Sequence, residues 1–295
     1  MRISVAITTY KRAWALPYSL ESLIQQSRSP DEVVVVLKPS GDGSEEVIRR
    51  YDSKLPIRVI EQTKGNFTDA VSLAIRNSKG DIVLFIDDDA IAEKDWVKKY
   101  EDIFQNNDVG GASGLTYIAI LDSGNILKKT SEIFYPSIPT KEVFYRRPLP
   151  YFRDYCGWVS VSGFMGLRPC TGPVIKSALL GGVNMGFRRE LVMDCPLDTL
   201  YKKSRRGLWN EQTLAICVRK KGYNTYNLME PGVAPIVWHI KHMQSLTRRK
   251  GFWQEFWVHY DRVANFWRLR KLGVEVSYTA YLAALIVALR RRPIQ

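Results

Sequence analysis

The sequence predicts an α/β protein with a mostly parallel central sheet, flanked by helices and followed by a helical C-terminal extension. The chain has 295 residues, of which 45% are hydrophobic and 25% charged, so it can bury a sizeable core. The uninterrupted run Val33–Val36 is typical of a parallel strand that is buried on both faces. Strand and helix patterns also alternate through the first third of the chain, which favours βαβ units.

The N-terminal elements follow from this alternation. Apolar runs predict strands, and apolar residues near helical spacing predict helices. Because parallel strands are joined by right-handed crossovers, the order predicts a doubly wound sheet. The expected strands are 3–8, 32–37, 57–60 and 81–86, and the expected helices between and after them are 14–26, 44–51, 67–77 and about 93–105.

The pattern weakens from about residue 110 to 182 and then becomes regular again. Short strands are expected near 112–121 and 159–162. A helix over 210–221 is closed by Gly222, which suits a left-handed C-terminal cap. Strands at 225–228 and 234–239 follow, and the composition changes after residue 240. We therefore expect one large domain over 1–245 and an extension over 246–295.

The extension is basic and aromatic. Positions 253, 256, 257, 260 and 267 fall near one face of a predicted helix. This aromatic stripe either packs on the preceding domain or lies on an anionic membrane surface. The next apolar segment, 278–289, is about 18 Å long as a helix and cannot span a hydrocarbon core of about 30 Å. It is expected to lie at an interface, to dimerise or to cover the domain.

Charge, the absence of certain apolar segments and the cysteine content limit the expected classes of partner and the expected cellular compartment. Lys+Arg 43 against Asp+Glu 30 gives a formal charge of +13, which favours nucleic acid, acidic lipid or a phosphorylated small molecule as partner. The N-terminus lacks the apolar region of a signal peptide, and an apolar stretch of membrane-spanning length is absent. A cytoplasmic location is therefore expected, with peripheral attachment to the inner face of the membrane. The four cysteines have no metal-type spacing and are expected to be reduced core thiols.

The sharpest chemical signal is Asp87-Asp88-Asp89, directly after the predicted strand 81–86. Ligands of open α/β sheets bind at the carboxyl ends of the strands. Three adjacent carboxylates repel one another unless a cation offsets them, and such hard oxygen ligands suit Mg²⁺ or Mn²⁺ shared with substrate phosphates. The alternative is a solvated turn that caps the next helix.

Five segments, in order, resemble family 2 glycosyltransferases of GT-A fold, over roughly residues 1–245. The resemblance implies an enzyme that moves a sugar from a nucleotide diphosphate donor to an acceptor hydroxyl with inversion. The acceptor would be a glycan, a polysaccharide or a lipid-linked molecule. The segments are 5–12 (VAITTYKR), 32–44, 85–89 (FIDDD), 181–188 (GGVNMGFR), and Asn210-Glu211 with Arg219, Gly222 and Tyr223.

The resemblance also implies roles for individual residues. Asp87 and Asp89 match the D-x-D motif that holds Mg²⁺ or Mn²⁺. His239 resembles the histidine that sometimes completes the metal site, and His242 is a weaker candidate for the same role. Glu211 falls where the general base is expected. The implied nucleotide-binding residues are Thr9, Tyr10, Arg12, Asp42 and Asp88, and the implied donor- or acceptor-binding residues are Gly182, Asn184 and Trp209.

Other interpretations of these residues stay open. Glu211 also suits a helix N-terminus, a lone histidine such as His239 is more often structural, and Arg12 also suits a surface charge. The basic run 202–206 steers an anionic donor or acceptor, or is a solvated loop.

The sequence departs from the family at two places that bear on the donor base. Leu37-Lys38-Pro39 replaces the acid that usually follows the second strand. Asp42 is then the substitute, although an Asp beside Gly41 and Gly43 is equally typical of a turn. The third helix reads Ala70-Val71-Ser72 instead of the family's Ala-Arg-Asn. Uridine, guanosine and thymidine donors therefore all stay open.

Two other functions compete with the transferase. A nucleic-acid-binding protein would use the aromatic and Arg-rich extension for stacking and phosphate contacts. The Asp triplet would repel phosphates, and a nucleic-acid motif is not found, so we expect no nucleic-acid partner. A catalytically degenerate relative would act as a sugar-binding or scaffold module, because the acid that contacts the donor base is missing.

Overall fold

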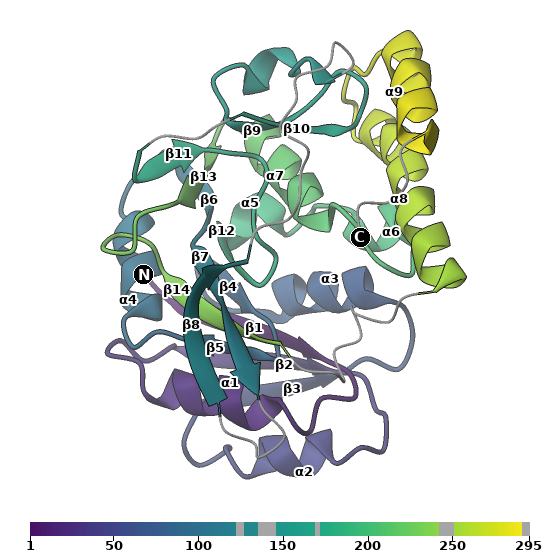
Figure 1. The fold of residues 1–295 in the computed structure, drawn as a ribbon. Coiled ribbons are helices and arrows are strands. Elements are labelled where there is room, and N and C mark those ends of the chain that lie inside the picture. The colour runs from purple at the N-terminus through teal and green to yellow at the C-terminus, as the bar shows by residue number, and fades with distance from the viewer. Residues whose placement is uncertain (122–126, 135–145, 169–171, 242–250, 291–295) are drawn as a thin grey trace.

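The computed structural model describes residues 1–121, 127–134, 146–168, 172–241 and 251–290 (Figure 1). Its centre is an eight-stranded sheet with the order β11-β13-β6-β12-β4-β1-β2-β3. The strands are β1 (Ile3–Thr9), β2 (Glu32–Leu37), β3 (Ile57–Glu61), β4 (Ile82–Ile86), β6 (Val109–Ser113), β11 (Val174–Lys176), β12 (Asn184–Arg188) and β13 (Asn224–Leu228).

This sheet confirms the predicted fold class. β3, β2, β1 and β4 run parallel to one another, and β13 runs parallel to β6. β12 is antiparallel to both β4 and β6, and β11 is antiparallel to β13. The run Val33–Val36 is buried throughout, as expected for a strand covered on both faces.

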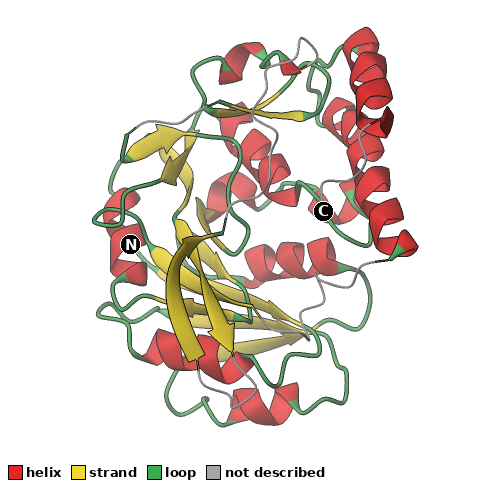
Figure 2. Cartoon of the chain, in the orientation of Figure 1, coloured by secondary structure: helices red, strands yellow, loops and turns green. Residues whose placement is uncertain are grey.

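Helices cover both faces of the sheet (Figures 1 and 2). Alternate residues of β2 enter two separate cores: Val34 and Val36 pack with α3 and α7, whereas Val33 and Val35 pack with α1 and α4. Asn66 and Asp69 form a capping box at the start of α3. The α-helices that precede the C-terminal extension are α1 (Leu16–Ile24), α2 (Ser44–Arg49), α3 (Phe67–Asn77), α4 (Trp96–Ile103), α5 (Arg189–Val192), α6 (Leu197–Leu200) and α7 (Asn210–Lys220).

A second, four-stranded sheet has the order β5-β14-β7-β8. Its strands are β5 (Ala90–Ala92), β7 (Leu115–Leu121), β8 (Leu127–Ile133) and β14 (Ile236–Lys241). The segment 112–121, where short strands are expected, contains the end of β6 and the whole of β7, and these two strands belong to different sheets. Gly114 lies between them, where an added Cβ would stand 1.9 Å from the carbonyl oxygen of Pro235. Glycine therefore permits the close backbone approach at which the chain changes sheet.

The C-terminal extension forms α8 (Phe252–Lys271) and α9 (Tyr278–Arg290), beside a small hairpin of β9 (Gly157–Val159) and β10 (Met165–Leu167). Leu269, Leu272 and Val274 belong to the same core as strand residues of the main sheet. Phe266 of α8 stacks on Tyr281 of α9 with ring centroids 4.3 Å apart. The extension therefore packs on the domain.

The aromatic stripe of α8 is not the face that packs. Trp253, Phe256 and Trp267 are exposed, whereas the buried face carries Asp261 and Phe266. The interpretation in which the stripe packs on the domain is wrong for those three rings, because polar and apolar residues of the opposite face fill the contact. None of the described helices is both long and apolar enough to cross a bilayer.

The expectation of reduced thiols is wrong for Cys195 and Cys217. A disulfide joins them across a Cα–Cα distance of 6.0 Å. Cys195 follows α5 and Cys217 lies in α7, so the pairing depends on how these two helices pack and spacing in the sequence could not reveal it.

Candidate active site

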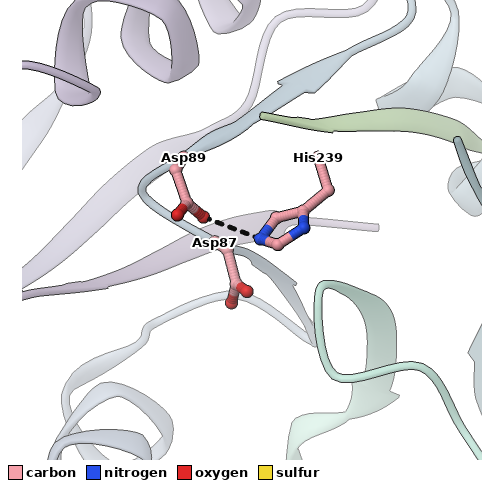
Figure 3. A group of neighbouring side chains, drawn as sticks. All are labelled: Asp87, Asp89 and His239. Atoms are coloured by element: carbon pink, nitrogen blue, oxygen red, sulfur yellow. Dashed lines mark ion pairs between the residues drawn. The ribbon is translucent and has the colours of Figure 1, made fainter. Parts of the chain in front are cut away.

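The predicted acidic cluster meets His239 at the carboxyl end of β4 (Figure 3). One ligand atom from each of Asp87, Asp89 and His239 lies within 4.8 Å of the other two. The second sheet brings them together: His239 pairs with Ala90 in the β14–β5 ladder, and the amide of Ile240 donates to the carbonyl of Asp89 at 2.8 Å. His239 Nε2 is 3.1 Å from Asp89 Oδ1.

Arg12, in the turn after β1, also contacts the acids. Its Nε lies 3.4 Å from Asp88 Oδ1, and its Nη2 lies 3.3 Å from Asp89 Oδ2. All three side chains are almost completely buried. The surface-charge interpretation of Arg12 is therefore wrong, because its guanidinium offsets buried carboxylates.

The pKa values of the three acids are shifted in different directions by burial and by neighbouring charges. Burial, reinforced by the charge of Asp89, raises the pKa of Asp87 to about 6 and raises the pKa of Asp88 well above its usual range. Burial also acts to raise the pKa of Asp89, but the hydrogen bond and charge of His239, together with the charge of Arg12, outweigh it and lower that pKa. Burial would lower the pKa of His239, but Asp89 and Asp87 outweigh it and raise that pKa.

These residues fit a divalent cation. Two carboxylates and an imidazole are ligands that Mn²⁺ accepts, and the carboxylates alone suit Mg²⁺. Asp89 Oδ2 is buried and makes no hydrogen bond within the described part of the chain, so it has acceptor capacity to offer. When His239 is neutral, Arg12 is the positive charge that contacts the acidic cluster. The two negative charges of ionised Asp87 and Asp89 then exceed the positive charge beside them, which favours binding of a cation.

The acids open onto a cleft of about 1240 Å³. The turn after β1 contributes Thr9 and Tyr10 to its wall, two residues for which the family resemblance implies nucleotide binding. Lys38, at the end of β2, also lines the cleft and lies over the Tyr10 ring with its Nζ 5.7 Å from the centroid. The remaining lining residues include Gln62, Gly65, Asn66 and Phe67 before and at the start of α3, the run 202–206, and Trp257 and Tyr260 of α8.

Glu211 lies in the first turn of α7 and is half-buried. Burial is the main cause that raises its pKa to about 7, and the charge of Asp87 adds to the shift. The two carboxyl groups are therefore within electrostatic reach of each other, although Glu211 itself does not line the cleft described above. A Cβ at Gly182 would stand 2.5 Å from Glu211 Oε1, so Gly182 provides the space that the Glu211 carboxylate occupies.

Three further predicted residues lie elsewhere. Asn184 is 0% exposed, and its side chain bonds Trp96, Tyr100 and the carbonyls of Leu115 and Pro235, which leaves it without capacity for a donor or acceptor. Asp42 accepts a hydrogen bond from the amide of Ala13 at 2.9 Å and does not line the cleft. Trp209, before α7, has a left-handed φ of 68° and packs against Phe164. His242, a weaker candidate for the metal site, lies outside the described residues.

Sequence reasoning missed Lys38 and Asn66 as site residues. Lys38 follows a parallel strand, so the rule that identified the Asp triplet could also have identified it. Asn66 carries no comparable signal. Its side chain donates to the carbonyls of Tyr201 and Ser204, at 3.0 and 2.9 Å, and this contact depends on the tertiary fold.

Comparisons with known proteins identify the family of this chain. The model of the family described as Glycosyl transferase family 2 matches residues 4–167, more than half of the chain. The chain belongs to glycosyl transferase family 2. It is 28% identical over 127 residues to an uncharacterised glycosyltransferase of Nostoc sp., with 42% of this chain and 39% of the relative covered. It is 30% identical over 126 residues to the glucosyl-dolichyl phosphate glucuronosyltransferase of Haloferax volcanii, with 40% and 39% covered. The matches span about two fifths of the length of these curated relatives.

Solved structures of glycosyltransferases share the GT-A fold of this family 2 chain. S. aureus TarS 1-349 in complex with UDP-GlcNAc has a TM-score of 0.57 at 16% identity, covering 98% of this chain and 72% of that one. GalNAc-T7 with UDP, GalNAc and Mn²⁺ has a TM-score of 0.61 at 15% identity, covering 89% and 48%. The mannosyltransferase PcManGT from Pyrobaculum calidifontis, in complex with GDP-Man and Mn²⁺, has a TM-score of 0.51 at 18% identity, covering 98% and 80%.

Proposed function

We propose that this family 2 chain is a metal-dependent, inverting glycosyltransferase that takes a nucleotide diphosphate sugar as donor. The observation that carries the proposal is the cluster of Asp87, Asp89 and His239 at the edge of a large cleft, with Glu211 within electrostatic reach. The donors bound in the similar structures, UDP-GlcNAc in TarS and GDP-Man in PcManGT, belong to the same chemical class, and the structures of GalNAc-T7 and PcManGT contain Mn²⁺.

Asp87, Asp89 and His239 would hold the cation, Mg²⁺ or Mn²⁺. When bound, it supplies positive charge that stabilises the departing nucleotide diphosphate. Arg12 holds Asp88 and Asp89 in place through ion pairs of 3.4 and 3.3 Å. Thr9, Tyr10 and Lys38 line the part of the cleft assigned to the nucleotide.

Glu211 would act as the general base. Inversion requires a carboxylate that accepts the proton of the acceptor hydroxyl while that oxygen attacks the anomeric carbon from the face opposite the leaving group. The raised pKa of Glu211, about 7, makes it a stronger proton acceptor than an ordinary glutamate once it is ionised. The acceptor is a glycan, a polysaccharide or a lipid-linked molecule.

Two substitutions test this assignment. Glu211→Gln should lower the transfer rate by about 10²–10⁴-fold, because general base catalysis is lost, while donor binding measured by titration calorimetry stays unchanged. Asp89→Asn should instead abolish the increase in thermal stability that UDP or GDP gives in the presence of Mn²⁺.

Glu190→Gln is the matched control, because Glu190 is an exposed glutamate of α5 and should retain full activity. A fully active Glu211→Gln variant would exclude this residue as the base. Donor binding by the unaltered protein without transfer to any acceptor would favour the degenerate, sugar-binding alternative.

We also propose that α8 attaches the protein to an anionic membrane surface. Phe252 and Trp253 are 74% and 68% exposed, and the chain carries a formal charge of +13. The protein should co-sediment with vesicles that contain phosphatidylglycerol, and Phe252→Ser with Trp253→Ser should abolish this binding. Equal binding to vesicles of phosphatidylcholine alone would contradict the electrostatic part of the proposal.

The cytoplasmic location predicted from the sequence stays a prediction. Disulfides are rare in reducing compartments, so the pair Cys195–Cys217 makes thiol titration of the native protein the relevant measurement.

A further inference from the structure

The segment 202–206, here called the basic loop, is held at the edge of the cleft by hydrogen bonds to Ser204. Ser204 Oγ donates to Asp261 Oδ2 at 2.8 Å, and Asn66 donates to the carbonyl of Ser204 at 2.9 Å. Asp261 is 0% exposed and pairs with Arg268 at 2.6 Å. Asp261, which belongs to a buried ion pair, and Asn66, the N-cap residue of α3, thus hold Ser204 in place. The other side chains of this loop are cationic.

The cationic side chains of the basic loop are directed to the cleft. Lys202, Lys203 and Arg205 are exposed, and all three line the cleft together with Arg206. Within the described residues, Lys202 and Lys203 form no ion pair with a carboxylate. Ordering unpaired like charges side by side is unfavourable unless an anion binds among them.

The donor does not account for this charge. Arg12 and a divalent cation together balance the charges of the Asp triplet. A nucleotide diphosphate sugar then adds one negative charge on each of its two phosphates. The basic loop and Lys38 provide more positive charge than these phosphates neutralise, so the loaded cleft keeps a positive excess.

The position of the basic loop in the chain favours the acceptor. The loop leads directly into α7, whose first turn carries Glu211, the proposed base. Because the acceptor hydroxyl has to reach Glu211, groups on the adjoining segment lie on the side from which the acceptor enters. An anionic group on the acceptor would therefore meet Lys202 and Lys203.

An aromatic run leads from the basic loop to the outside of the molecule. It consists of Phe252, Trp253, Phe256, Trp257 and Tyr260, with successive ring centroids between 5.2 and 5.9 Å apart. Its inner end, Trp257 and Tyr260, lines the cleft, and the Arg205 guanidinium lies 5.4 Å from the Trp257 ring centroid. Its outer end is exposed, and phenylalanine rings offer no hydrogen bond, so the run suits an apolar chain.

We propose that the acceptor is an amphiphile whose phosphate group binds the basic loop and whose apolar chain lies along the aromatic run. The proposal rests on the proposed function, because it assigns the anion to the acceptor of a transferase. The proposed occupant of the cleft is one molecule of a lipid phosphate. Lys202, Lys203 and Trp257, which line the cleft, then have a role in acceptor selection.

Farnesyl phosphate, farnesol and inorganic phosphate are probes that separate the two halves of this site. Each is titrated into the full chain with UDP or GDP and Mn²⁺ present at saturation, so that the donor site is filled, and tryptophan fluorescence is followed. Farnesyl phosphate should bind at least about tenfold more tightly than either farnesol or inorganic phosphate. Equal binding of inorganic phosphate and farnesyl phosphate would overturn the proposal in favour of a site for free phosphate.

Charge reversal tests the basic loop. The double variant Lys202→Glu, Lys203→Glu should weaken farnesyl phosphate binding at least about tenfold without changing the Kd of the nucleotide. Lys94→Glu is the matched control, because Lys94 is an exposed lysine that does not line the cleft. Both lysines of the double variant are exposed, so an unchanged thermal unfolding curve is expected. An equal loss of nucleotide affinity would assign the loop to the donor and overturn the proposal.

Trp253→Ala tests the aromatic run, with Trp267→Ala as control because Trp267 is an exposed tryptophan of α8 outside the run. Trp253→Ala should reduce the affinity for farnesyl phosphate toward that for inorganic phosphate, and Trp267→Ala should not. Binding to anionic vesicles with no saturable binding of farnesyl phosphate would overturn the proposal and leave a bilayer contact. The two proposals can be distinguished. If the proposed function is wrong, the protein does not bind the nucleotide or Glu211→Gln does not slow transfer. Titrations of the probes without nucleotide then still show whether the basic loop and the aromatic run bind farnesyl phosphate.

Discussion

At the scale of single residues, the acids were predictable from the local sequence pattern, whereas the residues that pair with them were not predictable from that pattern. The Asp triplet follows a strand that is recognisable from composition alone, so its place at the edge of the sheet follows from the strand-end rule. Arg12, a nucleotide-binding residue by family resemblance, lines the cleft and also pairs with Asp88 and Asp89, and these ion pairs were not predicted. Asn184 looked like a ligand-binding residue because it lies in a family motif, yet every polar atom of its side chain serves the core.

The pH dependence of transfer belongs to this scale. Because burial raises the pKa of Glu211 to about 7, protonation should remove the base as the pH falls through that value. The rate at low donor and acceptor concentration should therefore be highest above pH 7 and fall about tenfold per pH unit on the acid side. A pH profile of kcat/KM measures this decrease on the acid side, the acid limb of the profile.

Glu211→Asp gives the control for that profile. An aspartate has a lower intrinsic pKa, so the acid limb should move to lower pH in this variant. A limb that stays in place would assign the titration to another group of the site, such as His239, whose pKa is raised by Asp89 in spite of its burial.

At the scale of elements, long periodic segments were predicted well and short strands were not. The helices α3 and α7 and the strand β2 begin where the sequence pattern places them. β5 has only three residues, and its identity as a strand comes from pairing with β14, which lies far along the chain. Local patterns carry no information about such a pairing, so the meeting of His239 with Asp89 could be expected only from family resemblance.

Asp261 of α8 pairs with Arg268 of the same helix and accepts a hydrogen bond from the basic loop, and it makes a testable contribution to stability. Asp261→Ala leaves the Arg268 guanidinium buried without its partner and removes the acceptor of Ser204 Oγ and of the Leu208 amide. The free energy of unfolding should fall by about 3–5 kcal/mol, measured by urea denaturation.

Asp194→Ala serves as the comparison. Asp194 pairs with Lys221 at 3.9 Å on the surface, and its removal should leave the unfolding curve almost unchanged. Equal effects of the two substitutions would show that Asp261, with its contacts to Arg268 and to the basic loop, stabilises the fold no more than a surface carboxylate does.

At the scale of the whole molecule, the fold class was predictable, whereas the relation between the domain and its extension was not. A boundary near residue 245 follows from the change in composition, but Leu269, Leu272 and Val274 complete a core that also contains residues of β1, β2 and β4. Composition reports which residues are apolar and gives no information about which core they join. The division into 1–245 and 246–295 stays a proposal about sequence organisation, and we expect the two parts to unfold together.

Thermal unfolding tests this coupling. Circular dichroism of the helices and tryptophan fluorescence should report one coincident transition, because the shared core cannot be lost from one part alone. Leu269→Ala should shift both signals to lower temperature by the same amount, since it opens a cavity in that core. Leu282→Ala, at a side chain of α9 that is 41% exposed, should shift neither. An early fluorescence transition confined to the extension would contradict a single core.

The pairing of β14 with β5 has a consequence for biosynthesis. Asp87 and Asp89 leave the ribosome early, whereas His239 follows only after both sheets have been translated almost in full. A nascent chain that stops before β14 would carry the acids without their imidazole, and the cleft wall contributed by α8 would also be absent. The transferase would then become competent to bind its cation and its substrates only as one of the last events of its maturation.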